Sequence, residues 1–253
     1  MRILLTGASG HLGKLLVANL GNEFDFVRLG RNDGDFEWTL GVIPPPEILE
    51  GVDAIVHLAW SMKDRKADGH KNIGGSHLLA QCAGTARIPF LFISSVAVLG
   101  KSNYGNSKRE AEKLIASENG SILRIGLVKN VNRYGGDIRK VQLVLKSNHK
   151  INFTLAEDFI SSIRFWLEGQ VKNLPTSKIY TLVSGSQTAT EFFKSPTGRN
   201  IFVQEYLIWS FLKIFSLFST TARNSLDAFQ SFKSTPDIRT LKDDRNNLSD
   251  PQL

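Results

Sequence analysis

Three residues of one stretch of the chain carry functional groups that can transfer a proton. Tyr104 and Lys108 are four positions apart, and Ser95 ends an apolar run at residues 88–95. Helical residues four apart share a face, so the ammonium group of Lys108 can lie near the Tyr104 hydroxyl. A nearby positive charge favours the phenolate and lowers the pKa of a tyrosine, whose reference value is about 10. These three groups are the ones needed to move a proton at an alcohol or ketone while a nicotinamide exchanges hydride.

A glycine-rich segment near the amino terminus is typical of a phosphate-binding turn. Gly7, Gly10 and Gly13 follow an apolar run at residues 2–6 and open a helical pattern at residues 12–20. Glycines at this spacing let the backbone approach a pyrophosphate, and the amides at the helix N-terminus attract that anion. We therefore predict that a dinucleotide contacts six residues of this turn, namely Gly7, Ser9, Gly10, His11, Leu12 and Gly13.

The end of the second apolar run bears on which dinucleotide binds. Residues 24–29 are followed by Gly30 and Arg31, with no acidic residue at the strand end. An acidic residue there usually holds the free 2′-hydroxyl of NAD, whereas an arginine accommodates the 2′-phosphate of NADP. Arg31 therefore favours NADP, and NAD stays an alternative because Asp33 or Asp35 could still reach the ribose.

These residues lie on a regular alternation of apolar runs and helical patterns. Further strands are expected at residues 54–59, 88–95 and 121–125, and further helices at residues 73–83 and 108–117. Such alternation implies right-handed crossovers, a parallel sheet and helices on both faces. The expected fold is α/β, a Rossmann-type doubly wound parallel sheet. Ser95 would then face the crevice at the carboxyl ends of the strands, where such sheets bind ligands.

The alternation weakens after about residue 128. A helix at residues 156–167 and a strand at 178–183 are still expected. We predict an NAD(P)-binding Rossmann domain over residues 1–150, a small, mostly helical substrate-binding region over 151–242, and a frayed tail over 243–253.

A long apolar stretch at residues 201–218 is expected to form an amphipathic helix. Gln204, Glu205 and Lys213 interrupt it, so it is a poor membrane span. Docking against the core is favoured, and peripheral contact with an anionic membrane is the alternative.

Composition and charge narrow the class of protein. Hydrophobic residues make up 42% and charged residues 22% of 253 residues, as in globular proteins. The net charge of +7 suits a polyanionic partner. The basic cluster of Lys63, Arg65 and Lys66 lacks interleaved aromatic residues, so no nucleic acid is expected. A first strand at Arg2 leaves no room for a secretion signal, so we expect a cytoplasmic protein.

His57 lies within the apolar run at residues 54–59. It is interpreted as a core histidine, because no second histidine or acidic residue stands at metal-ligand spacing. No metal site is predicted.

The chain resembles the extended short-chain dehydrogenase/reductase superfamily and, within it, the NAD-dependent epimerase/dehydratase family. The motifs that carry the resemblance are residues 6–13, 53–59, 72–76, 94–100, 104–108 and 123–124. The resemblance implies that Ser95, Tyr104 and Lys108 are catalytic and that Lys108 also holds the nicotinamide ribose. It further implies that Leu58 and Ala59 line the adenine-side crevice, and that the region after residue 128 closes over a nucleotide-linked sugar.

The sequence departs from this family at several positions. Only eight residues separate Ser95 from Tyr104, where the family usually has a longer loop. Ile125 and Leu99 replace a familiar proline and tyrosine. Val96 and Ala97 occupy the positions of an acidic pair that dehydratases usually add, so dehydration is the least favoured reaction.

We therefore expect an NAD(P)-dependent oxidoreductase or epimerase that acts on a nucleotide-activated sugar. The alternative is a non-catalytic dinucleotide-binding regulator or scaffold of the same fold, which the short loop before Tyr104 motivates. An RNA-binding relative would need a continuous basic groove. A homodimer is left open, and a role in polysaccharide biosynthesis rests on analogy alone.

Overall fold

A seven-stranded parallel sheet forms the centre of the computed structural model. The structure describes residues 1–31, 34–61, 67–129, 142–171, 179–194, 200–215, 225–227, 230–231 and 233–236. The strand order is β10-β6-β5-β4-β1-β2-β3. The bounds are β1 Arg2–Thr6, β2 Asp25–Gly30, β3 Phe36–Glu37, β4 Ala54–His57, β5 Phe90–Ser95, β6 Ser121–Ile125 and β10 Ile179–Leu182. The expected Rossmann-type doubly wound sheet is confirmed.

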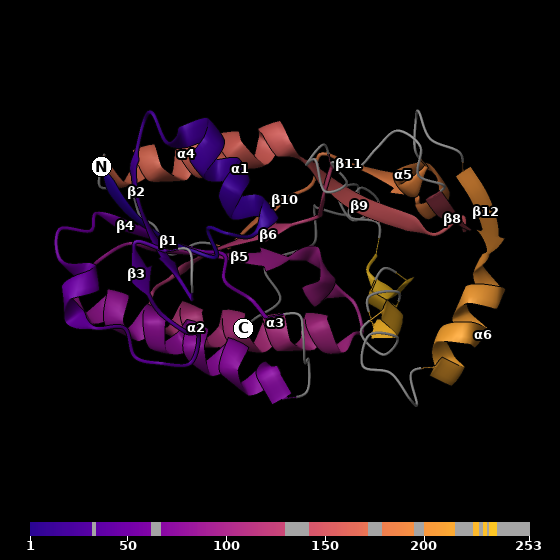
Figure 1. Cartoon of the computed structure of the whole chain (residues 1–253), viewed down its shortest axis with the longest axis horizontal. Coiled ribbons are helices and arrows are strands. Elements are labelled where there is room, and N and C mark those ends of the chain that lie inside the picture. The colour runs from indigo at the N-terminus through magenta and orange to yellow at the C-terminus, as the bar shows by residue number, and fades with distance from the viewer. Residues whose placement is uncertain are drawn as a thin grey trace, which may run out of the picture.

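Helices cover both faces of this sheet (Figure 1). On one face lie α1 (His11–Leu20) and α4 (Ala156–Val171), and on the other lie α2 (Ala67–Thr85) and α3 (Asn103–Ser117). Each face has its own apolar core, since strands buried on both sides carry apolar residues at consecutive positions. All four residues of β4 are buried accordingly.

The strand order reverses at β1, which lies between β2 and β4. In open parallel sheets the crevice at such a reversal, beyond the carboxyl ends of the strands, is the usual ligand site. Thr6 at the end of β1 is in register with His57, and His57 is in register with Phe92 of β5. The strand ends that bear the candidate residues therefore meet at one edge of the sheet.

Two small sheets lie beyond the main one, toward one end of the molecule in Figure 1. The first contains β7 (Leu127–Lys129), β9 (Lys150–Leu155) and β11 (Gly185–Thr188), and the second pairs β8 (Gln142–Lys146) with β12 (Asn200–Gln204). The remaining elements are α5 (Ala189–Phe193), α6 (Glu205–Phe215) and the short 3-10 helices η1 (Pro46–Leu49) and η2 (Val96–Leu99).

The apolar stretch at residues 201–218 differs from its expected form. Its first residues belong to β12, which pairs in parallel with β8, and the helix α6 begins only at Glu205. Ile201 and Val203 are β-branched, which suits a strand once β8 offers a partner. The single amphipathic helix expected over the whole stretch is therefore wrong for its first part.

The helix that bears Tyr104 and Lys108 also differs from its expected bounds. It was expected from Lys108, but α3 begins at Asn103, because the Ser102 hydroxyl accepts a hydrogen bond from the Gly105 amide at 3.0 Å and caps the helix. Tyr104 thus lies in the first turn of α3.

The structure does not test the predicted domain boundary at residue 150, which stays a prediction. Two elements that follow residue 150 belong to the main body of the fold: β10 joins the main sheet, and α4 packs on it. The tail at 243–253, Asp33 and the basic cluster at 63–66 lie outside the described residues. None of the described helices is long and apolar enough to cross a membrane.

Candidate active site

A cavity of about 500 Å³ opens at the carboxyl edge of the main sheet. Its walls come from the glycine turn, the end of β5, the start of α3, the segment 125–128, the start of β9 and two C-terminal residues. The residues that line it are Gly7, Gly10, His11, Leu12, Gly13, Leu58, Trp60, Ile93, Ser94, Ser95, Val96, Ala97, Tyr104, Lys108, Ile125, Gly126, Leu127, Val128, Lys150, Ile151, Asn152, Ser231 and Thr235.

Each glycine of the turn lacks a side chain for a different structural reason. Gly7 has φ +72°, a left-handed conformation, and a Cβ there would lie 2.8 Å from the Ala59 amide nitrogen. A Cβ on Gly13 would lie 2.4 Å from the Gly7 carbonyl oxygen, so α1 could not approach the turn. A Cβ on Gly10 would meet only the Gly7 oxygen, at 3.2 Å, among the described atoms. Gly10 is therefore the glycine whose side-chain space faces the cavity rather than the protein.

Helix α1 begins without a capping side chain. Its N-cap residue is Gly10, and no side chain among the described residues accepts from the first-turn amides. These amides belong to residues that line the cavity. Uncapped amides and the positive end of the helix dipole together make this edge suited to an anionic group.

A buried hydrogen-bonded chain holds the neighbouring strand ends in place. The Thr6 hydroxyl oxygen accepts from the amides of Leu58 and Ala59, at 3.2 and 3.1 Å. Its own hydrogen is then directed to Nδ1 of His57, at 2.6 Å, and Nε2 of His57 donates to Ser76 at 2.8 Å. Burial, and then the charge of Lys108, lower the His57 pKa to about 3, so the ring is neutral. The interpretation of His57 as a core histidine agrees with this arrangement.

Lys108 is buried at the floor of the cavity. Its Nζ donates to the Ile93 carbonyl oxygen at 2.9 Å and lies 3.8 Å from the ring centroid of Trp60 and 4.4 Å from that of Phe92. Burial lowers the Lys108 pKa to about 7, although the Glu112 carboxylate acts in the opposite direction. The aromatic faces offer the ammonium group a cation–π contact in place of water.

Trp60 connects Lys108 with Tyr104. The ring of Tyr104 meets that of Trp60 edge to face, with centroids 6.4 Å apart and an interplanar angle of 89°. The same indole carries the Lys108 ammonium over its face. Tyr104 and Lys108 thus share one aromatic neighbour on the cavity wall.

Ser95 is the last residue of β5 and lies directly before the short loop that leads to α3. Its hydroxyl oxygen accepts from the Ala97 amide at 3.2 Å and caps η2. A hydroxyl that accepts in this way keeps its hydrogen for a second partner. Ser95 and Tyr104 line the same cavity despite the short connection between them.

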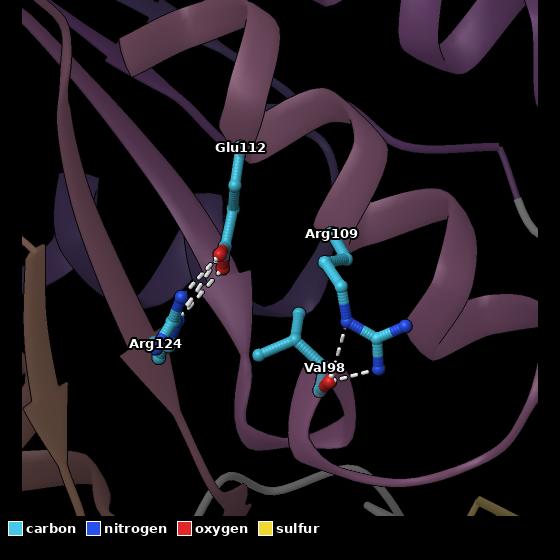
Figure 2. A network of polar contacts seen from close by, with 4 residues as sticks. All are labelled: Val98, Arg109, Glu112 and Arg124. Carbon is cyan, nitrogen blue, oxygen red and sulfur yellow. Dashed lines mark hydrogen bonds and ion pairs between the residues drawn. The ribbon is translucent and has the colours of Figure 1, made fainter. Parts of the chain in front are cut away.

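Two arginines fix the helix that carries Tyr104 and Lys108 (Figure 2). Arg124 of β6 binds the fully buried Glu112 carboxylate with three contacts of 2.6 to 3.1 Å. Arg109 donates to the carbonyl oxygens of Val98 and Gly100, in the loop after Ser95. Bidentate guanidinium contacts restrict orientation as well as distance. They join α3 to the sheet at one point and to the short loop at another.

The structure brings most of the predicted site residues together. Of the predicted cofactor-binding residues, Ser9, Ala59 and Arg31 do not line the cavity, and both Ser9 and Arg31 are exposed. Asp35, considered as a ribose ligand, accepts instead from the Arg28 amide and guanidinium, at 2.7 Å each. That ion pair holds the Asp35 pKa below its usual value.

Sequence reasoning missed several cavity residues, notably Trp60, Asn152, Ser231 and Thr235. Trp60 directly follows the motif at residues 53–59 that carries the family resemblance, so that motif is a signal that could have found it. Ser231 and Thr235 lie more than 120 positions from Tyr104 and belong to no local pattern.

The doubly wound sheet, with a glycine turn at the reversal of strand order, defines a Rossmann-type protein. Residues 3–120 match the model of the NAD dependent epimerase/dehydratase family. The resemblance found in the sequence is therefore confirmed over this part of the chain.

One curated relative shares part of the sequence. Over 120 residues the chain is 35% identical to a UDP-2-acetamido-2,6-beta-L-arabino-hexul-4-ose reductase of Pseudomonas aeruginosa. The match covers 45% of this chain and spans only 30% of the relative.

Solved structures share the fold at low sequence identity. A dTDP-4-dehydrorhamnose reductase from Yersinia enterocolitica is 20% identical, with a TM-score of 0.61 over 81% of this chain and 85% of that one. The corresponding enzyme from Bacillus anthracis, in complex with NADP, is 17% identical, with a TM-score of 0.61 over 81% and 86%. A UDP-glucuronic acid 4-epimerase from Bacillus cereus, in complex with UDP-glucuronic acid and NAD, is 17% identical, with a TM-score of 0.63 over 81% and 86%.

Proposed function

We propose that this protein is an NAD(P)-dependent reductase or epimerase of a nucleotide-activated sugar. The observation that carries the proposal is that one cavity contains the glycine turn together with Ser95, Tyr104 and Lys108. A dinucleotide against the turn and an alcohol or ketone near Tyr104 would then share one cavity. The reductase and epimerase names of the similar proteins support this substrate class.

The residues present fit a nicotinamide dinucleotide. The uncapped start of α1 would hold the pyrophosphate, and the open side of Gly10 leaves room for it. The bound dinucleotide would supply the hydride acceptor or donor. Lys108 is proposed to hold the nicotinamide ribose. Arg31 is proposed to pair with a 2′-phosphate, and the engagement of Asp35 with Arg28 supports the preference for NADP.

Each catalytic side chain has a separate task. Tyr104 is proposed to give a proton to, or take one from, the reacting oxygen. Ser95 would donate a hydrogen bond to that oxygen while its own oxygen stays bound to the Ala97 amide. Lys108, when charged, would favour the Tyr104 phenolate, and its pKa near 7 lets its charge respond to what enters the cavity.

Reduction and epimerisation use the same residues, whereas dehydration has less support. Val96 and Ala97 are buried and carry no acid or base. The curated relative is named a reductase, which favours reduction over epimerisation.

The alternative, a non-catalytic regulator or scaffold, is not favoured, although the short loop before Tyr104 suggested it. The short loop is held by Arg109, and it leaves Ser95 and Tyr104 on one cavity. A homodimer, a cytoplasmic location and peripheral membrane contact through residues 201–218 stay predictions. The exposure of Tyr206 and Ile214 on α6 is compatible with the last of these.

Tyr104→Phe tests the proposal, because it removes the hydroxyl without opening a cavity. We expect turnover on a panel of UDP- and dTDP-linked sugars to fall by about 10²–10⁴-fold, with NAD(P)H affinity unchanged. Tyr180→Phe is the matched control, since Tyr180 lies on β10, outside the cavity. A Tyr104→Phe enzyme as active as the parent would overturn the proposal.

A further inference from the structure

A C-terminal segment contributes to the site from far along the chain. Its described residues, 225–227, 230–231 and 233–236, lie beside α3 and α6 and are yellow in Figure 1. Ser231 and Thr235 line the cavity, and Asp227 is 5% exposed. A buried carboxylate in such a segment requires hydrogen-bond partners.

The partners of Asp227 are the first amides of the helix that bears Tyr104. Oδ1 accepts from the Asn103 amide at 2.9 Å, and Oδ2 accepts from the Tyr104 amide at 3.3 Å. The Ser102 hydroxyl accepts from the next amide, that of Gly105. First-turn amides have no partner inside a helix, and a carboxylate at this end also interacts favourably with the helix dipole. Asp227 and Ser102 therefore divide the capping of α3 between them.

Two further hydrogen bonds tie the segment to the loop before α3 and to the strand β9. The Ser234 hydroxyl accepts from the Lys101 amide at 2.7 Å, and the Pro236 carbonyl accepts from the Asn152 side chain at 2.7 Å. A Cβ on Gly100 would lie 2.6 Å from the Ser234 hydroxyl, so the close approach depends on that glycine. The loop before α3 and the strand β9 are thereby joined through residues more than 80 positions away.

We propose that Asp227 is a positioning residue for Tyr104, and this rests on the proposed role of Tyr104 as acid and base. Proton transfer requires the hydroxyl to lie within hydrogen-bond reach of the reacting oxygen, and small displacements reduce the rate strongly. Tyr104 stands in the first helical turn, which frays most readily. By binding the Tyr104 amide itself, Asp227 fixes the backbone from which the phenol projects. The segment that contributes Ser231 and Thr235 to the cavity thus also sets the position of the acid and base.

The test uses Asp227→Ala in the full chain, followed by amide hydrogen exchange and kinetics. Loss of the cap should speed exchange of the Asn103 and Tyr104 amides by about 10-fold or more. The kcat should fall by about 10-fold or more because Tyr104 is displaced. The NAD(P)H Kd should stay within about twofold, since the lost bonds hold the start of α3 and not the glycine turn. Asp227→Asn keeps one acceptor oxygen, so both effects should be partly restored.

Two control variants separate positioning from general loosening. Glu205→Gln removes the charge that pairs with Lys233, a residue of the C-terminal segment, but leaves α3 untouched, so it should retain the parent kcat. Ser102→Ala removes the other cap of α3 and should speed exchange at Gly105 with a smaller loss of kcat. If Asp227→Ala does not fold, Asp227→Asn is measured against the same criteria.

The outcomes keep this inference distinct from the proposed function. If Tyr104→Phe is inactive while the Asp227 variants match the parent in kcat and exchange, the positioning role is refuted and the proposed function stands. If Tyr104→Phe retains full activity, the proposed function itself fails. A kcat loss in Ser102→Ala equal to that in Asp227→Ala would also refute a specific role for Asp227.

Discussion

The two walls of the cavity are built in different ways. The wall proposed for the dinucleotide is backbone from one short segment, in which Gly7, Gly10 and Gly13 make room for each other and for a ligand. The opposite wall consists of side chains from separate segments, with Tyr104 and Lys108 packed on Trp60. The first wall depends on the absence of side chains, and the second depends on their mutual orientation.

The two walls also differ in how they affect the stability of the folded state. The glycine turn leaves amides toward the cavity, where water or an anion can satisfy them. The opposite wall buries an ammonium group, and burial lowers the Lys108 pKa from 10.5 to about 7. Such a charge destabilises the folded state, which is typical of groups retained for function rather than stability.

The largest expected effect concerns Lys108 and stability as a function of pH. Its folded pKa of about 7 lies below the ordinary value of 10.5, so below pH 7 both states are charged and the full burial cost applies. Between these values the unfolded state binds the extra proton, so stability rises with pH, by up to about 1.4 kcal/mol per unit. Lys108→Met, which buries no charge, should be more stable than the parent near pH 6, with the difference shrinking toward pH 10.

Chemical denaturation across this pH range measures the difference. Lys113→Met is the matched control, since Lys113 lies on the same helix but is exposed. A constant difference between parent and Lys108→Met at all pH values would show that the buried amine does not titrate in this range. The two walls would then not differ in electrostatic cost.

The second prediction tests the backbone wall. Gly10→Val should fill the space left for a phosphate while the turn itself stays intact, because the Gly10 side chain position faces the cavity. We expect NAD(P)H affinity to fall by about 100-fold or more, as one or two charge-assisted hydrogen bonds are lost. Isothermal titration calorimetry measures the affinity.

Two other glycines provide controls for this variant. Gly74→Ala should retain binding, since no described heavy atom beyond its chain neighbours and its own helix backbone lies within 4 Å of a Cβ there. Gly13→Ala should instead damage folding, because of its 2.4 Å approach to the Gly7 oxygen. Unchanged affinity in a folded Gly10→Val protein would remove the turn from the proposed cofactor site.

The smallest effect concerns the choice of dinucleotide. Arg31 is exposed and lies outside the cavity lining, so any contact with a 2′-phosphate is solvent-screened. Arg31→Ala should weaken NADPH binding by about 10-fold and leave NADH binding unchanged, since one screened charge-assisted hydrogen bond contributes little more than this. Equal losses for both cofactors would show that Arg31 does not discriminate between them.

Local patterns in the sequence predicted the framework of this protein. The strands at residues 2–6 and 121–125 were predicted to the residue, because short buried runs are visible in the sequence itself. The glycine turn was predicted from the spacing of its glycines between an apolar run and a helical pattern, all of which lie within one short segment. Tyr104, Lys108 and Ser95 were identified as candidate catalytic residues from their order along the chain and from their positions near the ends of an expected strand and helix.

Other features followed only from contacts between distant segments. The start of α3 depends on Ser102 and on Asp227, which lies 123 positions beyond Tyr104. Residues 200–204 form a strand because β8 is there to pair with them. A local pattern can predict an element when the residues of that element alone determine its backbone conformation and its apolar face. Only the packing of the whole chain decides that Asp227 caps α3 and that Trp60 covers the ammonium group of Lys108. These partners have no fixed spacing in the sequence, so no local pattern can predict them.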